Sequence, residues 1–207
     1  MSLFARGYDL VMGIGERGRV GALRRAVVGP ARGRVLEIGA GTGLNFPYYQ
    51  PGAVVIATDP DAGMLQRARS RAREADADIL LIQADAQALP FPDAAFDEAV
   101  VGLAFCTIPQ PARALGELRR ILRPHGRLRM LEHVRVDHPA IAGRIQDWLT
   151  PVWRRVAGGC HLNRRTAGAV ASAGFAVEHT SAHWGGYLET ILARAPGEPV
   201  EPGTQTW

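Results

Sequence analysis

The sequence contains no lysine, only two cysteines and no long run of apolar residues. All 24 cationic side chains are arginine, and together with the many alanines and glycines this fits the codon usage of a GC-rich bacterial genome. Cys106 and Cys160 are too few and too far apart in the sequence for a disulfide framework or a C-x-x-C metal or redox motif. We therefore expect a reducing compartment and no metal.

No apolar stretch reaches the roughly 18 to 20 residues that a membrane-spanning helix needs. The N-terminal sequence MSLFARGYDLVMG also lacks the apolar core and the small-residue cleavage site of a secretory signal. These absences predict a cytoplasmic protein. Peripheral contact with a membrane stays open as an alternative, and the sequence makes no prediction of the oligomeric state.

The formal net charge of +4 and the isoelectric point of about 9.7 raise the question of nucleic-acid binding. The arginines are spread over small clusters, each on a predicted helix whose solvent-exposed face needs charge. We therefore expect no nucleic-acid partner. The clusters are Arg17/Arg19/Arg24/Arg25, Arg67 to Arg73 and Arg119/Arg120/Arg123.

Short apolar segments alternate with stretches of helical period along most of the chain. This alternation is typical of an α/β fold, a doubly wound and mostly parallel sheet with helices on both faces. The last two strands flank a turn at Gly185 and Gly186 and should pair antiparallel. The seven predicted strands cover residues 34–40, 53–59, 79–85, 98–104, 127–134, 175–183 and 187–195.

The length of 207 residues suits one core, and we predict a single domain over residues 1–195. Residues 1–30 should form an N-terminal helical cover, residues 138–163 an inserted lid, and residues 196–207 a flexible tail rich in proline and glycine. The lid should be a helix broken at Pro151, with an apolar face that lies either in the core or over a ligand pocket. That face comprises Ile141, Ile145, Trp148, Leu149, Val152, Trp153 and Val156.

The first predicted strand runs into a glycine loop, VLEIGAGTGLN, whose spacing does not fit a dinucleotide. The third glycine of a dinucleotide fingerprint should stand where Leu44 stands. Glu37 would repel a phosphate and attract an ammonium group. Asp59 closes the second strand, where a carboxylate can take ribose hydroxyls, and Asp85 closes the third, within reach of an adenine amine. S-adenosylmethionine carries all three groups.

Four segments, EIGAGTG, TDPDAGML, QADAQALPF and FDEAVVGLAF, occur in this order. Through them the chain resembles the class I S-adenosylmethionine-dependent methyltransferases over residues 33 to 195. The resemblance implies that the backbone of Gly39, Gly41 and Gly43 approaches the methionine part of the cofactor, and that Glu37 reaches its amino group. It also implies a ribose contact for Asp59. The other cofactor-binding residues that it implies are Pro60, Met64, Asp85, Ala86, Gly102 and Leu103.

Five further features resemble bacterial relatives of the membrane-associated thiol methyltransferases of animals: Tyr8-Asp9, FCTIP, LEHV, QDWLTPVW and GGCHLNR. The resemblance to phosphatidylethanolamine N-methyltransferases and quinone C-methyltransferases is looser. Together they imply in-line methyl transfer to a small lipophilic acceptor, thiol first, with S-adenosylhomocysteine as the product. Phospholipid-amine or other N-, O- or C-methylation stays open, as does S-adenosylmethionine binding without catalysis.

The residues predicted for the acceptor side have ordinary structural alternatives. Cys106 could be a buried hydrophobe, His133 a base, an acceptor contact or a structural histidine, and Asn163 the N-cap of the following helix. A zinc site from Cys160 and His161 lacks the usual ligand spacing. The predicted catalytic residues are His133 and His161, and the predicted acceptor contacts are Tyr8, Cys106, Trp148, Cys160 and Asn163.

Overall fold

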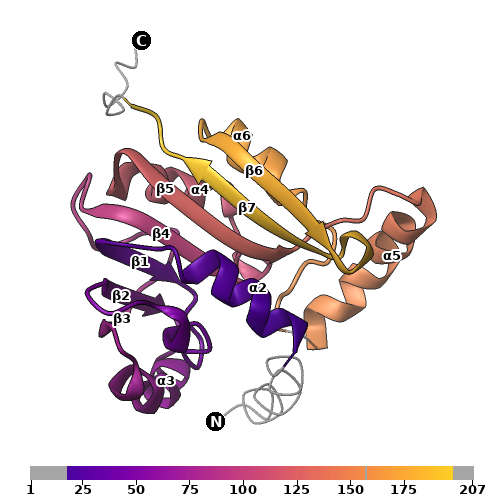
Figure 1. Cartoon of the computed structure of the whole chain (residues 1–207). Helices are drawn as coiled ribbons and strands as arrows, with labels where there is room; N and C mark the ends of the chain where they lie inside the picture. Colours follow the sequence, from indigo (N-terminus) through magenta and orange to yellow (C-terminus); the bar gives the residue numbers. More distant parts are fainter. Residues whose placement is uncertain (1–17, 157, 198–207) are drawn as a thin grey trace.

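The computed structural model describes residues 18–156 and 158–197, which form a seven-stranded sheet flanked by helices (Figure 1). The strand order is β3-β2-β1-β4-β5-β7-β6, and β7 runs opposite to the other six strands. This confirms the predicted doubly wound fold. The strands are β1 (Arg34–Ile38), β2 (Val54–Asp59), β3 (Asp78–Gln83), β4 (Phe96–Gly102), β5 (Leu122–His133), β6 (Ala176–His183) and β7 (Leu188–Arg194).

The helices cover both faces of this sheet because successive strand side chains point to opposite faces. Leu36 and Ile38 of β1 lie in a core with the apolar residues of α4 and with Val170 of α6. Val35 lies in a second core on the other face, with Val28 of α2 and Ala68 of α3. The helices are α2 (Arg19–Val28), α3 (Ala62–Glu74), α4 (Pro111–Ile121), α5 (Ala140–Val156) and α6 (Thr166–Ser172).

The chain changes direction across the sheet between β1 and β4, which are hydrogen-bonded neighbours. From β1 the chain proceeds outward through β2 and β3, and from β4 it proceeds through β5 in the opposite direction. Such a switch point opens a crevice at the carboxyl ends of the strands, where open α/β sheets bind ligands. The predicted site residues of β1 to β5 therefore meet at one edge.

Helix α5 differs from the prediction at Pro151, and it distinguishes between the two placements predicted for its apolar face. It runs unbroken through Pro151, so the predicted break is wrong; the Thr150 hydroxyl donates to the Gln146 carbonyl at 2.6 Å and supplements the bonding of the preceding turn. Its apolar face does not lie in the core of the described chain, since Ile141, Ile145, Trp148 and Val152 are each more than half exposed. Figure 1 shows α5 standing beyond the end of the sheet.

None of the described helices combines the length and apolar character required to cross a membrane. The predicted N-terminal cover is described only from residue 18 onward, where Val20 and Val27 of α2 pack against Leu131 of β5. Tyr8 and residues 198–207 of the predicted tail lie outside the described residues.

Candidate functional site

The glycine loop after β1 lies against the turn that follows β4. Gly39 has a φ of +66°, and a Cβ at this position would lie 2.3 Å from Cβ of Ala104, so only glycine fits. The Gly41 amide donates to Oδ2 of Asp59 at 2.9 Å. A Cβ on Gly41 would meet nothing within 4 Å. The loop is therefore closed toward β4 and open above Gly41.

Glu37 is fully buried on β1 and holds its carboxylate beneath this loop. It accepts a hydrogen bond from Asn45 Nδ2 at 2.9 Å and another from the Tyr49 hydroxyl at 2.7 Å. Burial raises the pKa of Glu37 to about 7, although these two bonds oppose the rise. A cationic group bound next to Glu37 would therefore favour its charged carboxylate form.

Arg24 extends this buried polar network and was missed in the sequence, where it was assigned to a solvent-exposed helix face. It is 3% exposed and donates to Asn45 Oδ1 at 2.7 Å. A side chain on Gly102 would lie 2.7 Å from Asn45 Nδ2, so the end of β4 must carry glycine here. The network leaves no space for a larger residue beside it.

Asp59 ends β2 with its carboxylate directed toward the glycine loop. Besides the Gly41 amide, it accepts a hydrogen bond from the Asp61 amide at 2.9 Å. Burial raises the pKa of Asp59, and these two bonds oppose the rise. The side chain therefore holds the loop in shape and presents carboxylate oxygens at the strand ends.

The remaining predicted cofactor residues follow the same edge. Pro60 is exposed and Met64 half-buried at the start of α3, while Asp85 is exposed after β3 and Ala86 is buried. Asp85 accepts from the Gln87 amide at 2.9 Å. Gly102 ends β4, and Leu103 follows it. The structure thus brings every predicted cofactor residue to the carboxyl ends of β1 to β4.

Glu132 organises the turn after β4 and was not among the site residues predicted from the sequence. It is fully buried at the end of β5 and accepts from the amides of Ala104, Phe105 and Cys106 at 3.0, 2.9 and 3.2 Å. Burial raises the pKa of Glu132 to about 7, against the effect of these bonds. The available signal was a carboxylate within an apolar strand, next to His133 in LEHV.

The segment after α5 docks on this turn. The amide and Nδ1 of His161 lie 2.9 and 3.1 Å from the Cys106 carbonyl oxygen. The Arg164 guanidinium donates to the carbonyl oxygens of Phe105 and Ile108. Residues 158–164 are therefore held against the turn that follows β4.

Asn163 has neither a capping role nor a contact with this turn. Its Nδ2 donates to Oδ1 of Asp147 at 2.9 Å, and α6 begins only at Thr166, with no side-chain cap. The N-cap interpretation is therefore wrong. Trp148 lies on α5 with 78% of its surface exposed.

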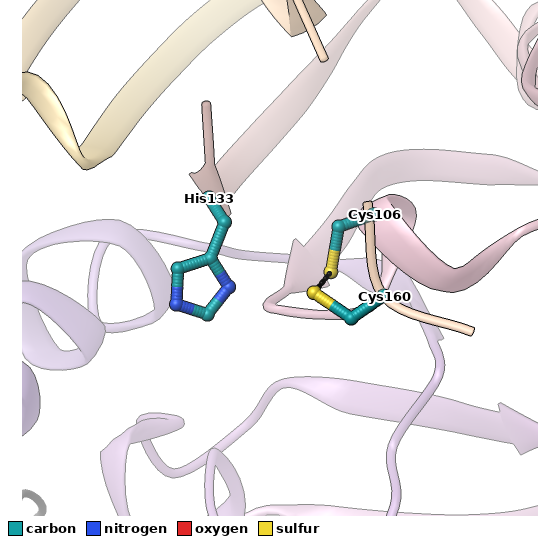
Figure 2. A group of neighbouring side chains, drawn as sticks. All are labelled: Cys106, His133 and Cys160. Atoms are coloured by element: carbon teal, nitrogen blue, oxygen red, sulfur yellow. Dashed lines mark hydrogen bonds between the residues drawn. The ribbon is translucent and has the colours of Figure 1, made fainter. Parts of the chain in front are cut away.

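The two cysteines, far apart in the sequence, meet His133 in space (Figure 2). The sulfurs of Cys106 and Cys160 are 3.3 Å apart, and these atoms and a ring nitrogen of His133 all lie within 4.8 Å of one another. Contact with Cys160, together with burial, raises the pKa of Cys106. The same contact lowers the pKa of Cys160 to about 4. Sequence spacing gave no indication of this cluster.

Comparisons with known proteins point to one family. A family model described as a methyltransferase domain matches residues 36–130. The chain is 32% identical to the thiol S-methyltransferase TMT1B of Rattus norvegicus, over 64% of this chain and 55% of that protein. It is 32% identical to the ubiquinone/menaquinone biosynthesis C-methyltransferase UbiE of Syntrophotalea carbinolica, over 73% and 67%. It thus spans about half the length of the thiol methyltransferase.

Solved structures share the fold at low sequence identity. An S-adenosylmethionine-dependent methyltransferase from Mesorhizobium loti superposes with a TM-score of 0.66 at 18% identity, over 86% of this chain and 99% of that one. The [4+2]-cyclase SpnF superposes with a TM-score of 0.67 at 19% identity, over 87% and 81%. Because one of these proteins is a cyclase, the shared fold does not by itself specify the reaction.

Proposed function

Because the chain belongs to the class I S-adenosylmethionine-dependent methyltransferases, we propose that it transfers the methyl group of S-adenosylmethionine to a small lipophilic thiol. The observation that carries the proposal is the joining of two half-sites. The glycine loop, with Glu37 and Asp59, contacts the turn that bears Cys106 through Gly39 and Ala104.

On the donor side, the described residues suit a ligand with an ammonium group and a ribose. Glu37 would receive the amino group of S-adenosylmethionine, Asp59 its ribose hydroxyls, and Asp85 and the Ala86 amide its adenine. The open side of Gly41 leaves room for the methionine part to approach the backbone. The bound donor would supply an electrophilic sulfonium methyl group.

On the acceptor side, support for a thiol comes from the relatives named thiol S-methyltransferase and from the few bases in the site. The acceptor sulfur would attack the methyl carbon in line as the bond to the sulfonium sulfur breaks. The products are a methyl thioether, S-adenosylhomocysteine and the proton lost from the thiol. Alignment and exclusion of water can supply much of the rate. The exposed apolar face of α5 favours lipophilic acceptors.

The two predicted catalytic histidines would have different tasks. The ring of His133 lies beside both sulfurs and could contact the acceptor directly. His161 has its Nδ1 beside the Cys106 carbonyl oxygen and would act by positioning the turn. We therefore expect His133→Ala to lower turnover on thiols by about ten-fold or more, as for other lost positioning groups. Cofactor affinity should stay unchanged.

Relatives with other activities define the competing acceptors. They include a phosphatidylethanolamine N-methyltransferase of Cereibacter sphaeroides, 37% identical over 53% of this chain and 55% of that protein. The test is release of S-adenosylhomocysteine in the presence of alkyl thiols, phenols, amines, quinols or phosphatidylethanolamine vesicles. We expect alkyl thiols to accelerate release most. Acceleration by amines or quinols alone would refute the thiol assignment, and binding of donor without release in any arm would refute catalysis.

A further inference from the structure

The cluster of Cys106, His133 and Cys160 has the composition of a metal site with an open position. We propose that these three side chains bind a zinc ion whose fourth position takes the acceptor thiol. Two sulfurs and one imidazole nitrogen leave one site free in tetrahedral coordination, as in catalytic zinc sites of the Cys₂His type. The inference deepens the proposed function and rests on it for the identity of the fourth ligand.

The three ligand atoms are close enough for one ion to join them once the side chains adjust. All three ligand atoms lie within 4.8 Å of one another, and the sulfurs are 3.3 Å apart. Zinc–sulfur bonds of about 2.3 Å in tetrahedral geometry place two sulfurs about 3.8 Å apart. Small side-chain rotations that separate the sulfurs therefore make room for the ion.

A ring nitrogen of His133 is a second observation that favours metal binding. Its Nδ1 is buried and has no hydrogen-bond partner among the described residues, although its ring has polar neighbours. Figure 2 shows a ring nitrogen directed toward the two sulfurs. A buried nitrogen without a partner costs free energy, and metal coordination would satisfy it. A disulfide between the cysteines would not.

The backbone around the three ligands is held by contacts that do not use the ligand atoms. Glu132 binds the amides of the Cys106 turn, and Arg164 joins that turn to the segment carrying Cys160. Cys160 itself follows Gly158 and Gly159, both with positive φ, and the Gly159 amide donates to the Arg154 carbonyl oxygen at 2.9 Å. The ligands thus come from three separate elements that are already fixed relative to one another.

The cluster lies beside the expected methyl donor. Ala104, two residues before Cys106, is the residue against which Gly39 of the glycine loop packs. Zinc would bind the acceptor as a thiolate, releasing its proton, because a thiol coordinated to such an ion is deprotonated. The thiolate sulfur then donates its electron pair to the methyl carbon, and the broken bond leaves its pair on the sulfur of S-adenosylhomocysteine. Zinc changes neither charge nor oxidation state.

Metal binding is tested on the full chain, reduced and freed of metal by a chelator. We expect one zinc ion per chain after dialysis against zinc, and a thiolate-to-cobalt absorption band when Co²⁺ is used instead. Since the sequence contains no other cysteine, this band reports Cys106 and Cys160 alone. Cys106→Ser, Cys160→Ser and His133→Ala should each weaken zinc binding by at least about ten-fold, as loss of a ligand requires.

The matched control is His179→Ala, which removes an exposed histidine of β6 and should bind zinc like the wild type. If a cysteine variant does not fold, the cobalt spectrum of the wild-type chain still decides the assignment. No stoichiometric zinc, or a cobalt spectrum without the thiolate band, would overturn the site.

Activity separates this inference from the proposed function. We expect removal of zinc to lower kcat/KM for an alkyl thiol by at least about ten-fold, with full recovery on zinc addition and unchanged affinity for S-adenosylhomocysteine. Equal thiol methylation with and without zinc would refute the catalytic role of the metal but leave the proposed function intact. Stoichiometric zinc with no thiol methylation would refute the thiol acceptor and leave the metal site standing.

Discussion

If Glu37 receives the amino group of the donor, as we propose, donor binding should depend on pH. Its pKa of about 7 means that the carboxyl is mostly protonated below neutrality in the free chain, whereas an ammonium ligand favours the carboxylate. Affinity for S-adenosylhomocysteine should therefore rise with pH up to about 7, by at most about ten-fold per unit. It should fall again at more alkaline pH, where the amino group of the ligand loses its proton and its positive charge.

Calorimetry from about pH 5.5 to about pH 8.5 measures this dependence. Glu37→Gln should bind weakly and lose most of the rise below neutrality. If the variant keeps the full slope, Glu37 is not the group that titrates, and its place in the cofactor site is wrong.

Asp59 combines two tasks whose loss should be severe. Its Oδ2 accepts from Gly41 and holds the glycine loop, and the proposed ribose contact uses the same carboxylate. Hydrogen bonds to a charged group contribute about 1.5 to 3 kcal/mol, so Asp59→Ala should weaken donor binding by about ten- to one-hundred-fold. Calorimetry with S-adenosylhomocysteine decides this. Asp93→Ala, which alters a carboxylate whose side chain is 78% exposed, is the control and should bind normally.

Residues with recognisable motifs were predictable, and residues that act through burial were not. Glu37 and Asp59 stand in segments whose order the sequence displays, and both lie at the predicted edge. Arg24 looked like one more surface arginine, because its burial depends on how α2 packs on the sheet. The sequence did not indicate that Cys106 and Cys160 form a pair. Their proximity depends on the contacts of Glu132 with the turn after β4 and on those of Arg164 with the same turn.

At the scale of elements, the role of α5 can be tested through its exposed apolar face. Trp148 is 78% exposed on the apolar face of α5, the helix that precedes residues 158–164. If this face lies over lipophilic acceptors, Trp148→Ala should raise KM for the thiol by several-fold, in keeping with the loss of an aromatic contact of about 1 kcal/mol. Donor affinity and the melting temperature should stay unchanged because the side chain is not part of the described core.

Steady-state kinetics with varied thiol, together with thermal unfolding, check this prediction. Arg144→Ala, another exposed position of α5, is the matched control and should leave KM unchanged. Equal losses in thiol use, donor affinity and melting temperature would instead assign Trp148 to a structural role.

The strands were predictable from apolar runs of four to seven residues because both faces of a parallel sheet are buried. Helix α5 was less predictable. Proline is a strong helix breaker on average, yet local bonding, including that of Thr150, sustains the helix through Pro151. Its exposed apolar face also contradicts the usual placement of such faces in a core. Both departures lie in the segment predicted to serve the acceptor.

At the scale of the whole molecule, the sheet determines where chemistry can occur and the segments around it determine which chemistry. The strand order follows from the alternation of strands and helices, and the donor edge follows from the switch point between β1 and β4. The proposed acceptor region depends on residues 134–156 and 158–166, which are placed by long-range contacts that sequence periodicity does not encode. This is why the donor was easier to predict than the acceptor.

The most direct test follows the methyl group itself. The wild-type chain is incubated with S-adenosylmethionine carrying a deuterated methyl group and with an equimolar mixture of an alkyl thiol, an amine, a quinol and phosphatidylethanolamine vesicles, and the products are identified by mass spectrometry. We predict that the label appears in the methyl thioether, in an amount equal to the S-adenosylhomocysteine formed. Asp59→Ala should greatly reduce the amount of labelled thioether. Label in an amine, a quinol or a lipid but not in the thiol, or in no product at all while the donor binds, would contradict thiol methylation.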